Sequence, residues 1–121
     1  MEKQVVVLDA NEERCLELCA NLGEWQYQTT PIHSLESLKS YMQNASCDVV
    51  ILDIDTVPVD NRIIRKLRTS NPEISLLCVS KDRFHPELHE AFSSDVFACV
   101  NRPIDNDELF YWLKSICENN E

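Results

Sequence analysis

Apolar positions along this chain follow two alternating patterns. Short continuous apolar runs are typical of strands buried on both faces of a sheet, and segments with an apolar residue every three or four positions are typical of helices. Strands are expected at Val5–Leu8, Trp25–Thr29, Val49–Leu52, Ile74–Val79 and Val96–Val100. Because a helical segment follows each run, we predict an α/β sandwich with a parallel sheet and right-handed crossovers.

Polar residues and breakers mark the ends of the expected helices. Side chains that can cap a helix, or a proline suited to its first turn, are expected to begin helices at Asn11, Ser34, Asp60 or Asn61, Pro86 and Asp105. The only glycine, Gly23, is expected to stop the first helix, and Asn71–Pro72 the third.

Size and charge narrow the class of protein. A chain of 121 residues is expected to form one domain, residues 1–121. The net charge of −10 makes binding to nucleic acid or anionic lipid by bulk electrostatics unfavourable. The first residues lead directly into a short strand rather than a signal peptide, and no apolar run reaches membrane-spanning length, so we expect a cytoplasmic protein.

Six cysteines are present, and without a secretory signal we expect them to be reduced. Most lie in apolar segments, where cysteine behaves as a small hydrophobe. The pair Cys15 and Cys19 and the pair His85 and His89 are each four residues apart. Neither pair has the further ligands that a zinc site needs, so we expect structural or surface roles.

Candidate chemistry gathers where the expected strands end. Asp9, Asp53, Ser80 and Arg102 follow four of the apolar runs, and carboxyl ends of parallel strands share one edge of a sheet. Paired carboxylates suit a hard divalent cation, and a hydroxyl with a guanidinium suits phosphoryl oxygens. No glycine-rich nucleotide-binding motif occurs.

These residues resemble the receiver domain of two-component response regulators over about residues 4 to 117. The resemblance rests on the apolar strand ending in Asp53, on Asp60 seven residues later, on Ser80 and on the step Arg102–Pro103. It implies a flavodoxin-like, three-layer α/β/α sandwich with a five-stranded parallel sheet of order 2-1-3-4-5.

The resemblance also assigns roles at the strand ends. Asp53 would accept a phosphoryl group from a histidine kinase or a phosphotransfer protein. Asp9, Asp53 and the backbone carbonyl of Asp55 would hold magnesium, Ser80 would meet a phosphoryl oxygen, and Arg102 stands where the family has lysine. Such a domain is a phosphoacceptor, not an enzyme beyond magnesium-assisted phosphorylation and dephosphorylation of itself.

Three departures from the family pattern affect this site. Ala10 stands where a second acid normally binds magnesium, Arg102 replaces lysine, and Cys99 occupies the position of the aromatic signalling residue. We therefore expect weak magnesium binding and slow phosphorylation. We also expect Arg102 to pair with Asp53 at rest, and Asp55 to lean inward in place of the missing acid.

Two alternatives remain. One is a degenerate receiver that binds proteins without phosphorylation. The other is an unrelated flavodoxin-like domain that binds flavin, against which the acidic loop after the first strand argues. In either receiver reading we expect a cis Arg102–Pro103 bond. We also expect helix four, strand five and helix five to form a contact face for a partner or a homodimer, because Phe110 and Cys117 extend the apolar surface of the last helix.

Overall fold

Five parallel strands lie at the centre of the molecule in the order β2-β1-β3-β4-β5. The computed structural model describes residues 3–119. The strands are β1 (Gln4–Leu8), β2 (Gln28–Ile32), β3 (Val49–Asp53), β4 (Ser75–Ser80) and β5 (Ala98–Asn101). The predicted α/β class, the parallel sheet and its strand order are confirmed.

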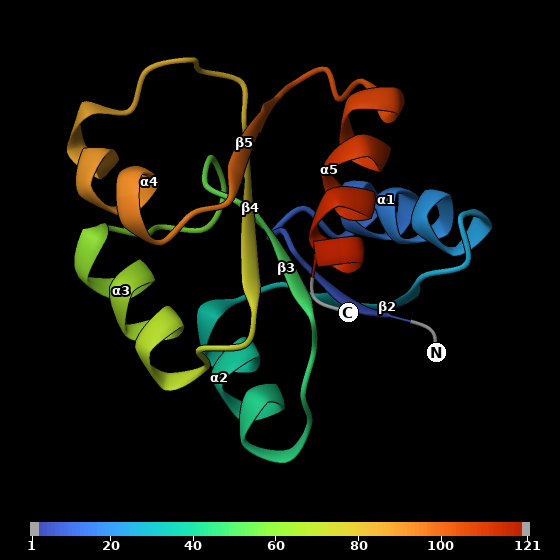
Figure 1. The fold of residues 1–121 in the computed structure, drawn as a ribbon, viewed down its shortest axis with the longest axis horizontal. Helices are drawn as coiled ribbons and strands as arrows, with labels where there is room; N and C mark the ends of the chain where they lie inside the picture. Colours follow the sequence, from blue (N-terminus) through green and yellow to red (C-terminus); the bar gives the residue numbers. More distant parts are fainter. Residues whose placement is uncertain (1–2, 120–121) are drawn as a thin grey trace.

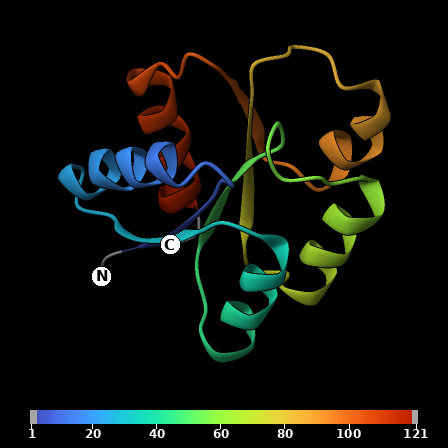
Figure 2. The same ribbon diagram turned by 180° about the vertical axis from the view of Figure 1, so that it is seen from behind.

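Helices cover both faces of this sheet. They are α1 (Glu12–Glu24), α2 (Leu35–Asn44), α3 (Asn61–Ser70), the 3₁₀ turn η1 (Pro86–Leu88), α4 (His89–Ser94) and α5 (Asn106–Asn119). Figures 1 and 2 show α1 and α5 side by side on one face, and α2, α3 and α4 on the other. The result is the predicted three-layer sandwich.

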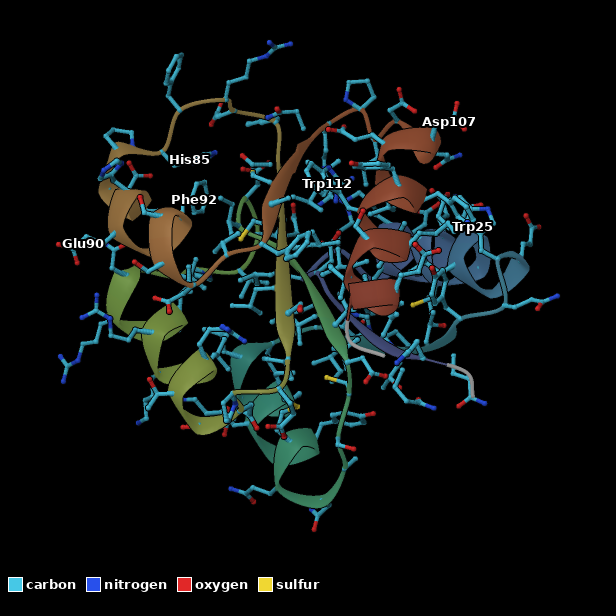
Figure 3. All side chains as sticks on the ribbon, viewed as in Figure 1. Trp25, His85, Glu90, Phe92, Asp107 and Trp112 are labelled. Carbon is cyan, nitrogen blue, oxygen red and sulfur yellow. The ribbon has the colours of Figure 1, made fainter. Side chains whose placement is uncertain are left out.

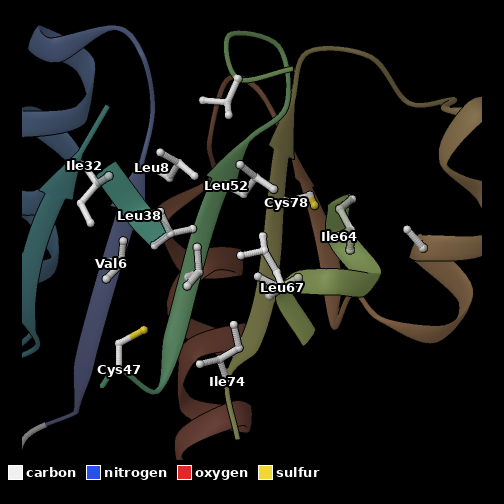
Figure 4. Close-up of a cluster of buried hydrophobic side chains, with 14 of the residues drawn as sticks. Val6, Leu8, Ile32, Leu38, Cys47, Leu52, Ile64, Leu67, Ile74 and Cys78 are labelled. Carbon is white, nitrogen blue, oxygen red and sulfur yellow. The ribbon is translucent and has the colours of Figure 1, made fainter. Parts of the chain in front are cut away.

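The alternation of side chains along the strands builds one apolar cluster on each face. Val6, Val50 and Leu76 pack toward α2, α3 and α4, in the cluster drawn in Figure 4. Their neighbours Val5 and Val49 point the opposite way, into the cluster with α1 and α5. Because both faces of the central strands are covered, these strands need continuous apolar runs rather than alternating ones.

Four of the predicted helix starts are capped as expected, and at one of them, the start of α5, Asp105 Oδ1 accepts hydrogen bonds from the N–H groups of Asp107 and Glu108. The side chains of Asn11, Ser34 and Asp60 each accept a hydrogen bond from a backbone N–H in the first turn of α1, α2 and α3. Such caps satisfy donors that have no partner within the helix. The helix α3 ends at Ser70, and Asn71 before Pro72 closes it as predicted.

The end of α1 differs from the prediction. The helix continues through Gly23 to Glu24, and β2 begins at Gln28 rather than at Trp25. The turn is made by Gln26, whose φ is 70°, in the left-handed region expected for glycine. Trp25 and Tyr27 alternate because both pack beside the α1–α5 cluster, and this pattern imitated a strand.

The region after β4 also departs from expectation. Pro86 begins a 3₁₀ turn, and the α-helix starts only at His89 and ends at Ser94. β5 starts at Ala98, two residues later than the predicted Val96. Such a short helix depends on tertiary contacts, because fewer than about 12 residues are marginal as an isolated helix.

Phe110 lies on a different side of α5 than predicted. Its ring meets that of Trp25 at the end of α1, with ring centroids 5.1 Å apart. Figure 3 shows Trp25 beside α1 and Trp112 toward β5. Phe110 therefore does not contribute to the face formed with α4 and β5, and the aromatic residues of that face are Phe97, Tyr111 and Trp112.

One peptide bond and the lengths of the helices test two further predictions. The Arg102–Pro103 peptide bond is cis, as predicted. Within residues 3–119, no helix combines the length and apolar character needed to cross a membrane.

Candidate functional site

The carboxyl edge of the sheet gathers the polar side chains that the sequence placed at strand ends. Asp9, Asp53 and Ser80 are buried, with 2%, 2% and 0% of their surface exposed. Hydrogen bonds of the backbone hold the edge together: the Asp9 N–H donates to the Ile32 carbonyl, and the Arg102 N–H to that of Ser80. The predicted placement of the four residues at one edge is confirmed.

Arg14 joins the two buried carboxylates. Its Nε lies 2.8 Å from Asp9 Oδ2, and its Nη2 lies 2.9 Å from Asp53 Oδ2. A second hydrogen bond runs from Nη2 to Asp9 Oδ1 at 3.1 Å, so the contact with Asp9 is bidentate. One guanidinium thus bridges the acids that were expected to hold a metal.

Arg102 approaches the same carboxylates from β5. Its Nη2 lies 3.3 Å from Asp9 Oδ2 and 3.5 Å from Asp53 Oδ1. The predicted pairing of Arg102 with Asp53 is therefore present, although the hydrogen bond itself goes to Asp9. Among the described residues, Asp53 Oδ1 and Arg102 Nε are buried without a hydrogen-bond partner.

Thr56, in the loop after β3, completes the cluster. Its Oγ1 donates to Asp53 Oδ2 at 2.7 Å and lies 3.1 Å from Asp9 Oδ1. It also accepts a hydrogen bond from the Ala10 N–H at 3.1 Å. Thr56 therefore ties the loop after β1 to the loop after β3.

Ser80 and Asp55 interact with each other. The Ser80 hydroxyl donates to Asp55 Oδ1 at 2.8 Å, and the Lys81 N–H donates to Asp55 Oδ2 at 2.8 Å. Both carboxylate oxygens of Asp55 thus have partners on β4 and the loop after it. This arrangement differs from the expected inward lean of Asp55 toward the position of the missing acid.

Ion pairs and hydrogen bonds in the pocket shift the pKa values of Asp9, Arg14 and Asp55. Burial by itself raises the pKa of the Asp9 carboxyl, but hydrogen bonds from Arg14 and from the Asn11 N–H outweigh it, so this pKa lies below its ordinary value. Hydrogen bonding to Asp9 raises the pKa of Arg14. For Asp55, hydrogen bonds from Lys81 and Ser80 overcome desolvation and lower the pKa.

In this arrangement the residues do not fit a magnesium ion. The two buried carboxylates face the two guanidiniums of Arg14 and Arg102, so their charges balance, and three of their four oxygens already accept hydrogen bonds. Ala10 supplies no third carboxylate. Across residues 3–119, no group of three or more His, Cys, Asp or Glu side chains is placed to hold a metal.

Sequence reasoning missed Arg14 and Thr56. Arg14 lies in the first turn of α1, where the helix dipole favours acids, and Glu12 and Glu13 follow that preference. A cation at such a position, five residues after Asp9, was the signal that could have revealed it. Thr56 offers no comparable signal, because a threonine in a turn has many local roles.

Known proteins were compared by sequence and by structure. No family model and no curated protein matches the sequence. Among solved structures, a signal receiver domain from Pseudomonas fluorescens superposes with a TM-score of 0.88 at 15% identity, over 99% of this chain and 98% of that one. A two-component response regulator from Clostridium difficile gives 0.85 at 15% identity, with 97% of each chain covered.

A CheY-like receiver domain from Methanospirillum hungatei agrees, with a TM-score of 0.84 at 12% identity over 99% of this chain and 97% of that one. This chain has the fold of a response-regulator receiver domain. At such identities the receiver fold is shown, and what the pocket does has to be argued from its own residues. Asp53 at the end of β3 and the paired arginines are the features on which that argument rests.

Proposed function

We propose that this chain is a signal-transduction module of the receiver fold that acts through contacts with other proteins, and that Arg14 and Arg102 take the place of the cation in its acidic pocket. The observation that carries the proposal is the Arg14 guanidinium bridging Asp9 and Asp53. On this proposal the module is regulatory and catalyses no reaction of its own.

The energetics of the pocket support this function. An ion that entered would have to displace a guanidinium that is 2.8 Å and 2.9 Å from the two carboxylates. The entering ion would itself pair with the carboxylates, so what it has to overcome is the loss of the bidentate Arg14–Asp9 contact and of the Arg14–Asp53 pair. Only about a third of the Arg14 side chain is exposed, so solvent offsets only part of this cost.

Phosphorylation of Asp53 is the second candidate. Asp53 Oδ1 is buried and accepts no hydrogen bond within the part of the chain described here, so this oxygen would act as the nucleophile once the pocket opens. Arg102 lies 3.5 Å from that oxygen, where it would stabilise an added phosphoryl group. The phosphoryl donor would be a histidine kinase or a phosphotransfer protein.

The partner face that we propose is formed by α4, β5 and α5. Phe97 is 43% exposed and Tyr111 is 62% exposed, and both rings contact Trp112. Aromatic side chains gathered on a protein surface are typical of interface centres. A second copy of the chain or a signalling partner would cover this face.

Treatment with a small phosphodonor, read by intact mass with and without magnesium, tests the proposal. We expect no measurable labelling of the natural chain. The double variant Ala10→Asp/Arg14→Ala should be labelled in a magnesium-dependent manner, because it restores an acid and removes the competing cation. Adding Asp53→Asn to that variant should abolish labelling.

Thermal unfolding with added magnesium is the control for this experiment. Magnesium should leave the Tm of the natural chain unchanged and should raise that of the double variant, because only a bound ion stabilises the folded state. Rapid magnesium-dependent labelling of the natural chain would overturn the proposal and leave phosphorylation of Asp53 as the function.

A further inference from the structure

A groove lies between α2 and α3, and its lining residues include none of the side chains of the acidic pocket. It has a volume of about 380 Å³, within the usual range of ligand pockets. Its walls are formed by apolar side chains with lysines and small polar residues around them: Leu35, Lys39, Met42, Gln43, Ile63, Lys66, Leu67, Ser70 and Asn71. Figures 1 and 2 show these two helices as neighbours on one face of the sheet.

The helix α3 is a basic element in an acidic protein. The chain has 11 basic residues and a net charge of −10. Four of the basic residues lie on α3, whose sequence NRIIRKLRTS contains no acid. Positive charge is therefore concentrated on α3, where Lys66 lines the groove, while negative charge prevails over the whole chain.

Some of these cations already have partners, and others do not. Arg65 pairs with Glu90 at 3.6 Å, and Arg68 donates to backbone carbonyls after α3. Arg62, Lys66 and, on α2, Lys39 form no salt bridge among residues 3–119, and all three are exposed. Two of them, Lys39 and Lys66, line opposite sides of the groove.

We propose that the α2–α3 groove binds an acidic segment of a partner protein, with an apolar side chain of that segment inserted between Met42 and Ile63. Charge complementarity favours this occupant: carboxylates would pair with Lys39 and Lys66 at the rim. An amphipathic helix laid into a groove buries apolar anchors at i, i+3 or i+4 spacing in this way. The apolar walls argue against a phosphate backbone.

This inference is independent of the acidic pocket, because within residues 3–119 none of the groove residues forms a hydrogen bond or an ion pair with Asp9, Asp53 or Arg14. The probe is a fluorescein-labelled synthetic peptide in which leucines recur at i, i+4 and i+7 among glutamates. Its control replaces the leucines by glutamine at unchanged charge. Fluorescence anisotropy measures binding, and ¹⁵N chemical shifts of the protein locate it.

We expect the leucine peptide to bind at the groove, to bind more weakly as salt increases, and to lose affinity when glutamine replaces leucine. Lys39→Glu and Lys66→Glu should each weaken binding by about tenfold, which corresponds to about 1.4 kcal/mol. Ile63→Gln should weaken it without changing charge. Arg83→Glu is the matched control, because Arg83 is exposed in the loop after β4 and undergoes the same charge reversal.

Three results would overturn the inference. They are no binding of the leucine peptide, shifts that map outside α2 and α3, and equal losses in Lys66→Glu and Arg83→Glu. Concentration-dependent shifts at the groove without peptide would identify a second copy of the chain as its occupant instead. None of these results bears on phosphodonor labelling of Asp53, so failure here is distinct from failure of the proposed function.

Discussion

At the scale of single residues, Arg14 decides what the strand edge can hold. Without it, Asp9 and Asp53 would be two adjacent buried acids with only Arg102 nearby, and such an arrangement attracts a cation. With it, both acids belong to an ion-pair cluster that is already neutral. On the proposed function, this one side chain on α1 would keep the edge of the sheet from holding a metal.

The lowered pKa of Asp9 makes the stability of the fold depend on pH. A carboxyl whose pKa is lower in the folded state stabilises that state above its unfolded pKa, about 3.9, and the contribution disappears as the pH falls through the folded pKa. We expect the free energy of unfolding to fall steeply below about pH 4. Chemical denaturation measured over this range tests it.

Asp9→Asn should be less stable than the natural chain at neutral pH and should show a smaller loss of stability in acid. Glu17→Gln is the control, because Glu17 is exposed on α1 and forms no salt bridge within the described residues. If the stability of Asp9→Asn fell as steeply at low pH as that of the natural chain, other carboxyl groups would account for the pH dependence of stability.

At the scale of elements, Asn61 connects α3 to the short helix after β4. Its Nδ2 donates to the Glu87 carbonyl at 2.9 Å, and its Oδ1 accepts from the Ala91 N–H at 2.9 Å. The turn η1 and α4 together cover only Pro86–Ser94, and no side chain caps the start of either. The Asn61 amide therefore holds an element that would not be stable alone.

Asn61→Ala removes both hydrogen bonds, and we expect it to lower the free energy of local opening of η1 and α4 by about 1–3 kcal/mol. Amide exchange at Leu88–Phe92 should accelerate more than exchange in α2, because the loosening is local. Asn61→Asp keeps the acceptor for the Ala91 N–H. Its amide exchange at Leu88–Phe92 should therefore be faster than in the natural chain and slower than in Asn61→Ala. Uniform acceleration over all helices would show that Asn61 stabilises the whole fold rather than α4.

At the scale of the whole molecule, the sandwich presents three chemically different surfaces. The acidic pocket lies at the carboxyl edge of the sheet, a basic groove lies between α2 and α3, and an aromatic face lies over β5 and α5. If both proposals hold, this one small domain would contact a partner at the groove and another at the aromatic face.

The aromatic face predicts reversible self-association. We expect sedimentation at increasing concentration to show a dimer, and the double variant Phe97→Ser/Tyr111→Ser to remain monomeric. Leu16→Ser is the matched control, since Leu16 is 55% exposed on α1 and its loss removes apolar surface from another face. If the natural chain stays monomeric at all concentrations, self-association is contradicted, and a different protein would be the partner of this face.

Much of this structure could be predicted from the sequence, because local patterns carry it. Continuous apolar runs mark strands covered on both faces, and Asn11, Ser34 and Asp60 cap helices through contacts within one turn. The placement of Asp9, Asp53, Ser80 and Arg102 at one edge follows from parallel strands ending together. Each of these inferences needs only neighbouring residues or the direction of a strand.

The tertiary structure alone decided what those side chains contact. Arg14 reaches Asp53, 39 residues away, because α1 follows β1, which lies next to β3 in the sheet, and no local pattern records that proximity. Trp25 resembled the start of a strand because burial against the α1–α5 cluster imposes alternation as a sheet does. The sequence by itself determined which residues meet at the edge of the sheet; packing determined that two arginines neutralise its acids, since ion pairing depends on positions in space.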